Sequence, residues 1–278
     1  MTTTQVPAIT LNNGVTIPQL GYGIWQVERD ATQRLVEHAF EVGYRHIDGA
    51  AAYGNERELG QAIAATSIPR GELFITTKLW NADQGYDSTL KAFETSMGKL
   101  GLTYLDLYLI HWPMPTEGRF AETWRAFEQI LGDGRIRAIG VSNFRIEDLQ
   151  HLLDDFDVVP AINQIELHPR LQQAELRQFH ADHGIATEAW SPLGHGGLLS
   201  DPTIAAIADA HGVSPAQALI RWHLDLGNIL FPKASSEERI SQNVDVFGFS
   251  LTDDEITRIN GLETGERTGA DPATFTGL

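Results

Sequence analysis

Short β-rich segments alternate with amphipathic helical segments along almost the whole chain. The helical segments repeat apolar residues at helical spacing, as Leu35, Val36, Ala39 and Phe40 do. Alternation of this kind is typical of βα units and of a parallel sheet. Eight segments have the length and composition of strands: 19–23, 44–48, 73–78, 105–111, 136–142, 161–166, 186–190 and 229–233. Eight βα units predict an α/β fold of the (β/α)8 TIM-barrel class.

The segment before the first unit predicts an N-terminal β-hairpin. Residues 9–17 alternate apolar and polar side chains around Asn13-Gly14, a pair that favours tight hairpin turns. No low-complexity linker or break in composition interrupts the chain, so we expect a single domain over residues 1–278. The segment after Gly261 is rich in Gly, Thr and Asp, and we expect it to lack regular structure.

Several residues mark the ends of the expected helices. Gly43 and Gly101 follow apolar helical patterns, where glycine favours a helix stop. The N-terminal signals are capping residues, in one case followed by proline and in another part of a capping box: Asp30, Ser88, Ser214 before Pro215, and Thr252 with Glu255.

Composition excludes several classes of partner. The chain has 20 Lys and Arg against 37 Asp and Glu, a net charge of −17, and no basic patch, so we expect no nucleic-acid binding. The first six residues lack the pattern of a signal peptide, and no apolar stretch approaches the roughly 18 residues of a membrane span. We therefore expect a cytoplasmic protein without a membrane partner. The chain has no cysteine, which excludes disulfides and thiolate ligands.

Polar and aromatic residues stand at or just after the ends of the predicted strands. In a parallel barrel all of these ends share one face, the face where barrel enzymes carry their active sites. A single such residue is as readily explained by helix capping or turn closure, but seven strand ends together favour a functional site. The residues are Asp48, Lys78, His111, Ser142 with Asn143, Gln164, Trp190 and Lys233.

Four of these positions suggest acid–base chemistry. Tyr53, in the loop after Asp48, is a poor proton donor near pH 7 unless a cation such as Lys78 stabilises its phenolate. A buried Lys78 needs a counter-charge, which Asp48 can supply. His111 can donate a hydrogen bond to a substrate oxygen. Spacing alone leaves a structural salt bridge and an ordinary core pair open as alternatives.

The motifs around these residues resemble the aldo-keto reductase family in order, spacing and residue type. The similarity extends from the hairpin to Asn243, and within the family it is greatest to the bacterial 2,5-diketo-D-gluconate reductases. It implies NADPH-dependent reduction of a small carbonyl compound by a monomer, with Tyr53 as general acid assisted by Asp48, Lys78 and His111. The motifs are Gly-Tyr-Arg-His-Ile-Asp48, Ala-Tyr53-Gly-Asn-Glu, Lys78-Leu-Trp, Leu-Ile-His111-Trp-Pro, Ile-Gly-Val-Ser142-Asn143-Phe, Asn-Gln164-Ile-Glu-Leu-His-Pro and Phe-Pro-Lys233.

The resemblance also implies a set of cofactor and substrate contacts, any of which could otherwise be plain core. Ser142, Asn143 and Gln164 match positions that hold the nicotinamide carboxamide, and Trp190 matches the residue that stacks on the ring. The remaining positions match the pyrophosphate loop (Ser191, Leu193), the 2′-phosphate site (Lys233, Ser235, Arg239), the adenine contacts (Gln242, Asn243) and the aromatic walls of the carbonyl pocket (Trp25, Trp80, Trp112).

Two positions depart from the family pattern. Gly49 replaces the threonine that commonly follows the aspartate, which predicts looser order around Asp48. Ala234 replaces the serine that usually follows Lys233, which removes one neutral donor from the phosphate site and weakens the prediction of NADPH preference.

Other signals and functions receive less support. The dinucleotide-binding fingerprint is absent, because the segment Gly21-Tyr-Gly23-Ile-Trp-Gln26 has glutamine where the last glycine is required. His180 and His183 have a spacing compatible with one helix face, but no third ligand is evident, so we expect surface histidines and no metal site. The acidic residues 253–255 are expected to complement a helix dipole. A non-catalytic nucleotide-binding subunit of the same fold is the main alternative. A barrel hydrolase or isomerase is a weaker one, because the chain shows no metal site or phosphate-binding glycine loop.

Overall fold

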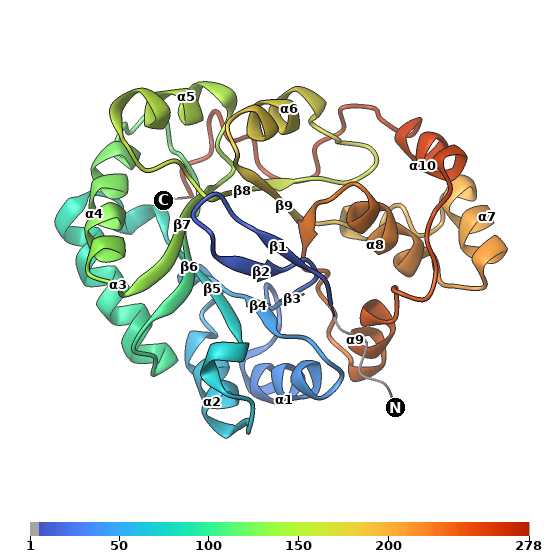
Figure 1. The fold of residues 1–278 in the computed structure, drawn as a ribbon, viewed down its shortest axis with the longest axis horizontal. Helices are drawn as coiled ribbons and strands as arrows, with labels where there is room; N and C mark the ends of the chain where they lie inside the picture. The colour runs from blue at the N-terminus through green and yellow to red at the C-terminus, as the bar shows by residue number, and fades with distance from the viewer. Residues whose placement is uncertain (1–5, 278) are drawn as a thin grey trace.

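Eight parallel strands form one curled sheet in the structure, a computed structural model that describes residues 6–277 (Figure 1). The order of strands in the sheet is their order in the sequence, as consecutive βα units require. The strands are β3 (Tyr22–Gly23), β4 (His46–Asp48), β5 (Phe74–Leu79), β6 (Leu105–Ile110), β7 (Ile136–Ser142), β8 (Ile162–Glu166), β9 (Ala186–Trp190) and β10 (Ile229–Leu230).

The two edges of this sheet meet. Parallel bridges join Leu20 to Leu230 and Gly23 to Lys233, and the Gly21 amide donates to the Leu230 carbonyl over 2.8 Å. A Cβ atom on Gly23 would lie 2.9 Å from the Phe231 carbonyl oxygen, just beyond β10, so glycine permits this close approach. The curled sheet agrees with the expected (β/α)8 arrangement, although the first and last strands are shorter than predicted.

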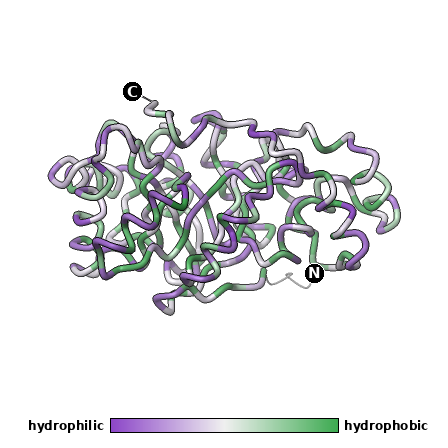
Figure 2. Tube along the Cα trace, turned by 90° about the horizontal axis from the view of Figure 1, so that it is seen from above, coloured by the Kyte–Doolittle hydropathy of each residue, from purple (hydrophilic) through white to green (hydrophobic). Residues whose placement is uncertain are grey.

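Helices surround the sheet, as Figure 1 shows. Hydrophilic and hydrophobic stretches alternate along them in Figure 2, and the predicted apolar face of the first helix is buried. The helices are α1 (Arg29–Glu41), α2 (Glu56–Ala65), α3 (Tyr86–Leu100), α4 (Phe120–Gly132), α5 (Ile146–Asp155), α6 (Ala174–Asp182), α7 (Pro202–His211), α8 (Pro215–Asp225), α9 (Glu237–Val244) and α10 (Asp253–Asn260). Within residues 6–277 no helix is long and apolar enough to span a bilayer.

Two of the four predicted helix caps are confirmed. Ser214 and Thr252 each form a capping box, and both side chains accept a hydrogen bond from the first turn. The prediction for Asp30 is wrong, because α1 begins at Arg29 and Asp30 lies inside its first turn. The prediction for Ser88 is also wrong: α3 begins two residues earlier, and the Ser88 hydroxyl donates to carbonyl groups of the preceding turn.

The predicted hairpin is present and covers the end of the sheet where the strands begin. β1 (Ala8–Thr10) pairs with β2 (Thr16–Pro18), and Gly14 adopts a φ of 82° in the turn between them. Ile17 is fully buried in a cluster with residues at the starts of several strands, such as Phe74 and Ile229. The hairpin therefore shields one end of the sheet, leaving the opposite end for the functional site. Residues 1–5, which carry most of the N-terminal signal-peptide argument, lie outside the described part.

The C-terminal tail (residues 261–277) has no helix or strand, as its composition predicts. It contacts the ends of the strands rather than their starts: Asn81, two residues beyond β5, donates a hydrogen bond to the Thr276 carbonyl over 2.6 Å. Phe275 packs on Trp112 with ring centroids 4.5 Å apart. The tail and the hairpin thus occupy opposite ends of the sheet.

Candidate active site

The residues predicted from strand ends lie together at the end of the sheet opposite the hairpin. Asp48, Ser142 and Trp190 are the last residues of β4, β7 and β9. Lys78 is the penultimate residue of β5, and His111 directly follows β6. Because all eight strands are parallel, these side chains emerge at one end, where loops after the strands can complete a site.

Lys78 is the centre of the site. Its ammonium donates to both Asp48 carboxylate oxygens, Oδ1 over 2.8 Å and Oδ2 over 2.7 Å, and to the Gly49 carbonyl over 2.9 Å. The Tyr53 hydroxyl lies 3.3 Å from Lys78 Nζ. Lys78 is fully buried and Asp48 is 2% exposed, so the pair is held in a nearly water-free setting. Gly49 contributes through its carbonyl oxygen, a contact that needs no side chain.

Burial and charge set the protonation of this group. Burial by itself would lower the pKa of Lys78, but Asp48 and Tyr53 outweigh it and raise that pKa, so Lys78 is cationic. Burial raises the pKa of Tyr53, while the Lys78 charge acts in the opposite direction, as expected for a cation that supports a phenolate. Tyr53 therefore carries its proton at neutral pH and has a cation beside the oxygen that would lose it.

His111 lies beside Tyr53 and Trp80. Its ring is edge-on to both, at centroid distances of 5.8 Å and 5.2 Å. Burial, assisted by the charge of Lys78, lowers the pKa of His111 well below its usual value, so the imidazole is neutral. A neutral imidazole has one N–H donor and one acceptor, which suits it to bind a carbonyl oxygen without transferring a proton.

Gln164 connects this group to a carboxyl side chain that sequence reasoning missed. Its Nε2 donates to Asp48 Oδ1 over 3.0 Å and to Glu188 Oε2 over 2.9 Å. Glu188 lies in β9, paired with Gln164 in the sheet register, and is fully buried. The sequence signal that could have revealed Glu188 is an acidic residue in the middle of a predicted strand, but only residues at strand ends were considered as site candidates. Both Gln164 N–H groups are engaged, which leaves its Oε1 as the free polar atom.

The predicted carboxamide and ring contacts form one hydrogen-bonded group. Asn143 adopts a positive φ of 65°, and its Nδ2 donates to Ser142 Oγ over 3.0 Å and to the His111 carbonyl over 3.0 Å. Its Oδ1 accepts from the Trp190 indole N–H over 2.8 Å. The Ser142 hydroxyl donates to the Gln164 carbonyl. The structure thus places Ser142, Asn143, Gln164 and Trp190 in contact with one another.

The predicted phosphate and adenine residues lie just before α9 and along it. Lys233, Ser235, Arg239 and Gln242 are exposed, and Asn243 is buried. In the described part of the chain neither Lys233 nor Arg239 is engaged in an ion pair, although the net charge is −17. The cap of α9 is Ser236, which sequence reasoning missed; it accepts a hydrogen bond from the Arg239 amide.

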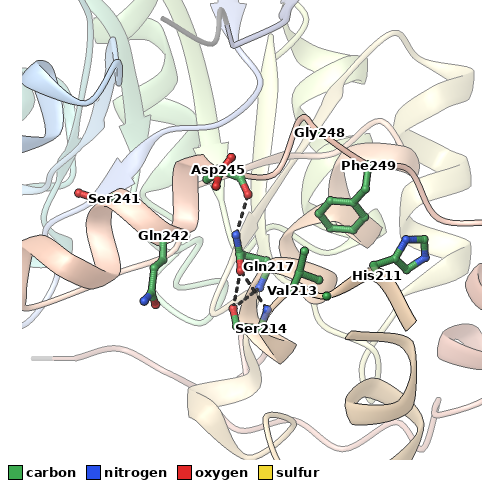
Figure 3. A pocket seen from close by; sticks show the side chains of 10 residues that line it. His211, Val213, Ser214, Gln217, Ser241, Gln242, Asp245, Gly248 and Phe249 are labelled. Atoms are coloured by element: carbon green, nitrogen blue, oxygen red, sulfur yellow. Dashed lines mark hydrogen bonds between the residues drawn. The ribbon is translucent and has the colours of Figure 1, made fainter. Parts of the chain in front are cut away.

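A cavity of about 740 Å³ lies between the turn joining α7 to α8 and the C-terminal part of α9 (Figure 3). Gln242 lines it, together with Ser214 and Gln217 of the α8 capping box. The candidate catalytic group, which consists of Asp48, Tyr53, Lys78 and His111, does not line this cavity.

Aromatic side chains and the tail form the rim of the site. Trp80 contacts His111, and Trp112 packs between Trp190 and Phe275 of the tail. Trp25 is 42% exposed and edge-on to His195, which follows β9. Sequence reasoning missed Phe275, because nothing in the tail's composition shows where it docks.

The expectation of surface histidines is wrong for His180. The ring is fully buried, with Nε2 2.9 Å from Asn163 Nδ2 and Nδ1 2.9 Å from Thr187 Oγ1. His183, in contrast, is exposed. Among residues 6–277 no group of three or more His, Asp or Glu side chains is arranged to hold a metal ion.

Comparison with known proteins gives a family for this geometry. Residues 18–264 match the sequence model of the aldo/keto reductase family. An aldo-keto reductase from Mycolicibacterium smegmatis is 58% identical over 97% of this chain and 98% of its own length. The chain belongs to the aldo/keto reductase family. The fold is therefore an aldo-keto reductase fold, and the glycines at 21 and 23 serve sheet closure rather than a dinucleotide fingerprint.

Several solved structures superimpose closely on this chain. The enzyme from Brucella melitensis has a TM-score of 0.90 and 54% identity, with coverage of 93% of this chain and 100% of its own. A variant of Gox0644 solved in complex with NADPH has a TM-score of 0.94 and 46% identity, covering 98% and 99%. A Bombyx mori aldo-keto reductase, solved in complex with NADP, has a TM-score of 0.89 and 38% identity, covering 95% of each chain.

Proposed function

We propose that this aldo-keto reductase uses NADPH to reduce small aldehydes, ketones or dicarbonyl compounds to alcohols. The observation that carries the proposal is the protonated Tyr53 hydroxyl, held 3.3 Å from an ammonium that Asp48 keeps charged. Its place beside the neutral His111 supports the same chemistry. We also assign the curled sheet, whose edges are bridged, to a closed (β/α)8 barrel with the site at the carboxyl ends of its strands.

The residues of this chain fit NADPH. Gln164 offers a free acceptor, and the Trp190 ring is only partly buried, so both can receive the nicotinamide part, with Ser142 and Asn143 alongside. Ser191 and Leu193 would flank the pyrophosphate, and Gln242 and Asn243 the adenine. Lys233, Ser235 and Arg239 would hold the 2′-phosphate; the two cations have no competing carboxylate partner in the described chain. The cofactor supplies the hydride.

The protein's own residues supply the proton and hold the carbonyl. As the carbonyl carbon gains a hydride, its oxygen becomes an alkoxide, a stronger base than a phenolate, and takes the Tyr53 proton. Lys78 stabilises the resulting phenolate, and Asp48 keeps Lys78 protonated and in place. His111, neutral because it is buried, can donate its N–H to the substrate oxygen without competing as the acid.

The walls of the site favour small substrates that carry an apolar or planar group. Trp80 packs on His111, and Trp112 packs on Trp190 and on Phe275 of the tail. We assign the exposed Trp25, which contacts His195, to the same wall. The sequence motifs also resemble those of the bacterial 2,5-diketo-D-gluconate reductases, and on that resemblance we add keto sugar acids to the proposed substrates. The monomeric state and the cytoplasmic location stay predictions from the sequence.

Replacing Tyr53 with phenylalanine tests the proposed acid. The variant lacks only the transferable proton, so we expect its Kd for NADPH to stay unchanged while kcat falls by about 10² to 10⁴, the usual range for general acid catalysis. Oxidation of NADPH would be followed with methylglyoxal, phenylglyoxal and a diketo sugar acid. Wild-type kcat in the variant would contradict the assignment. Wild-type protein that binds NADPH but reduces nothing in a broad carbonyl panel would instead indicate the non-catalytic alternative.

Replacing Arg239 with alanine tests the choice of cofactor. Arginine can form two charge-assisted hydrogen bonds to a phosphate, each worth about 1.5–3 kcal/mol against roughly 1 kcal/mol for the neutral donor lost at Ala234. We therefore expect NADPH to bind more tightly than NADH in the wild type, and Arg239→Ala to weaken NADPH by about tenfold or more while NADH is little changed. Titration of both cofactors measures this, with Arg258→Ala in α10 as the control. Equal affinities of the wild type for NADPH and NADH would show that Lys233 and Arg239 do not bind the 2′-phosphate.

A further inference from the structure

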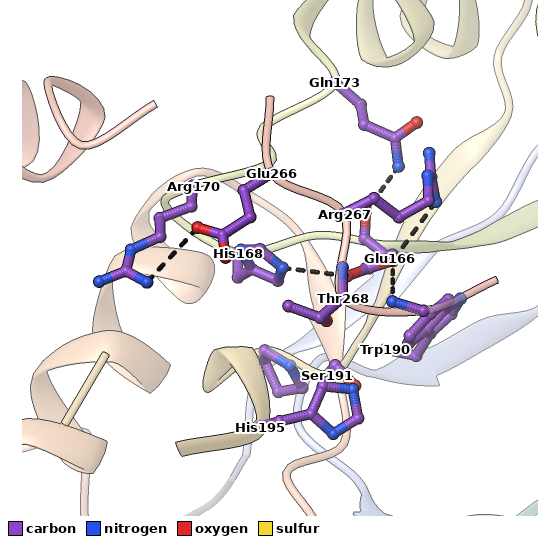
Figure 4. A network of polar contacts seen from close by, with 12 residues as sticks. Glu166, His168, Arg170, Gln173, Trp190, Ser191, His195, Glu266, Arg267 and Thr268 are labelled. Atoms are coloured by element: carbon purple, nitrogen blue, oxygen red, sulfur yellow. Dashed lines mark hydrogen bonds and ion pairs between the residues drawn. The ribbon is translucent and has the colours of Figure 1, made fainter. Parts of the chain in front are cut away.

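Glu166 is a buried carboxylate that the proposed reaction does not use. It is the last residue of β8, fully buried, and directly paired in register with Trp190 at the end of β9. Its position predicts a role at the site, yet its oxygens do not point to the catalytic group. They face the C-terminal tail instead (Figure 4).

Five donors converge on the two carboxylate oxygens. Oε1 accepts from the Thr268 amide over 2.6 Å, from the Thr268 hydroxyl and from His168 Nε2 over 3.1 Å. Oε2 accepts from the Gly269 amide over 3.1 Å, and Arg267 Nη1 lies 3.4 Å away. Burial by itself would raise the pKa of Glu166, but these hydrogen bonds lower it to about 2. The carboxylate is therefore charged at every physiological pH, and three consecutive tail residues are bound to it.

The tail that Glu166 holds lies against the Trp190 ring. A Cβ atom on Gly269 would lie 2.3 Å from Trp190 Cη2 and 3.0 Å from Glu166 Oε2, so this residue fits only as glycine while the ring keeps its place. The opposite edge of the same indole is fixed by the hydrogen bond from its N–H to Asn143. The ring is thus held at both ends, by Asn143 and by the segment that Glu166 binds.

We propose that Glu166 is a positioning residue for carbonyl reduction, which holds residues 267–269 so that Gly269 fixes the indole of Trp190 and the following tail closes the substrate pocket. The inference rests on the proposed function, in which Trp190 receives the nicotinamide. Beyond Gly269 the tail carries Phe275 to Trp112 and the Thr276 carbonyl to Asn81. Loss of the Glu166 contacts would therefore loosen both the ring and one wall of the pocket, while Lys78 and Asp48 stay intact.

Limited proteolysis tests the contacts between Glu166 and the tail independently of enzyme activity. The peptide bond between Arg267 and Thr268 is a trypsin site, and its amide N–H is one of the groups that Glu166 binds. Because cleavage needs local opening of the chain, we expect Glu166→Gln to be cut there about tenfold faster or more than the wild type. Cleavage after Arg34, inside α1, is the internal control. Glu266→Gln, which removes an exposed carboxylate paired with Arg170, is the matched variant and should behave as the wild type.

Binding and kinetics report the positioning role. In Glu166→Gln we expect the Kd for NADPH and the KM for phenylglyoxal each to rise about tenfold, with kcat at saturation changed less than either, because the proton donor is untouched. Gly269→Ala retains the Thr268 donors to Glu166 Oε1, and its Cβ crowds Trp190 more closely than Glu166 Oε2, so it should weaken NADPH binding with a smaller change in cleavage after Arg267 than Glu166→Gln causes. It serves as the test if Glu166→Gln fails to fold.

Two results would overturn the inference. One is equal cleavage after Arg267 in the wild type and Glu166→Gln. The other is faster cleavage with Kd and KM unchanged, which would make Glu166 an anchor of the tail alone. Failure of the proposed function looks different: the wild type itself would bind no NADPH or show no turnover, and the positioning role would fall with it, while the cleavage rates would still show whether Glu166 holds the tail.

Discussion

Glu188 shows how a single side chain alters the electrostatics of the whole site. It is fully buried beside Asp48, and burial, together with the Asp48 charge, raises its pKa to about 8. At neutral pH Glu188 is therefore protonated. Burial raises the pKa of Asp48 as well, but Lys78 donates to both Asp48 oxygens and acts in the opposite direction, so Asp48 is the carboxylate that pairs with the ammonium. His46, which faces Glu188 across 4.0 Å, is neutral because burial lowers its pKa to about 3. A net-neutral cluster is far less costly to bury than one with an unpaired charge.

The raised pKa of Glu188 predicts a pH-dependent loss of stability. Its folded pKa of about 8 exceeds the ordinary value of 4.5, so the folded state binds the extra proton between these limits. The stability it contributes is complete below about pH 4.5 and is lost as the pH rises through 8. Glu188→Gln should abolish that loss and gain up to a few kcal/mol over the wild type as the pH rises from 5 to 9, at about 1.4 kcal/mol per pKa unit.

Urea unfolding of the two proteins from pH 5 to 9 measures the difference. Taking the difference between variant and wild type removes the contributions of the buried histidines, which the two proteins share. Glu266→Gln, an exposed carboxylate of the tail, is the control and should give a curve parallel to the wild type. A Glu188→Gln curve that is also parallel would show that Glu188 is ionised in the folded protein.

Among the helices, the caps show what local sequence can and cannot determine. Ser214 is followed by proline and has Gln217 three residues on, so its capping box is complete within four residues. Ser88 also precedes an apolar pattern, but Gly85, with a φ of 111°, lets the chain enter α3 earlier, and Ser88 becomes part of the first turn. Where α3 begins depends on the conformation of the loop before it, and the residues within the helix do not determine that conformation.

Replacing Ser214 with alanine tests the contribution of a cap at the level of an element. The side chain accepts from the Gln217 amide, and loss of such a cap costs about 1 kcal/mol. We expect the free energy of unfolding to fall by about that amount, with kcat and KM unchanged, because Ser214 is no part of the catalytic group. Thermal or urea unfolding measures it. Ser250→Ala, at an exposed serine between helices, is the control; an equal loss there would rule out capping as the cause.

At the scale of the whole molecule, different segments and different kinds of contact cover the two ends of the curled sheet. The hairpin buries Ile17 against the starts of the strands, which seals that end with apolar contacts. At the other end the tail is held by polar contacts to Glu166 and Asn81, and the side chains beneath it stay available to a ligand. The hairpin thus closes one end of the sheet with apolar contacts, while polar contacts and the packing of Phe275 on Trp112 hold the tail beside the candidate site at the other.

The sequence by itself determined the parallel architecture and most of the candidate active site. The strands 136–142 and 186–190 occur as predicted, and Asp48, Lys78 and Tyr53 are in contact. These features are readable because side-chain periodicity and the common direction of parallel strands are properties of short segments and their order. The position of a strand-end residue at the carboxyl end of the sheet can therefore be predicted without knowing which residues it contacts.

Only the tertiary structure decided the features that depend on contacts between distant segments. Leu20 meets Leu230, Thr268 meets Glu166, and the buried His180 bonds to Asn163 and Thr187, pairs that no local pattern predicts. The protonation of Glu188 also follows from burial beside Asp48, not from its place in the sequence. Desolvation and hydrogen bonding depend on the surroundings in three dimensions, so the same residue types take different roles once the chain has closed.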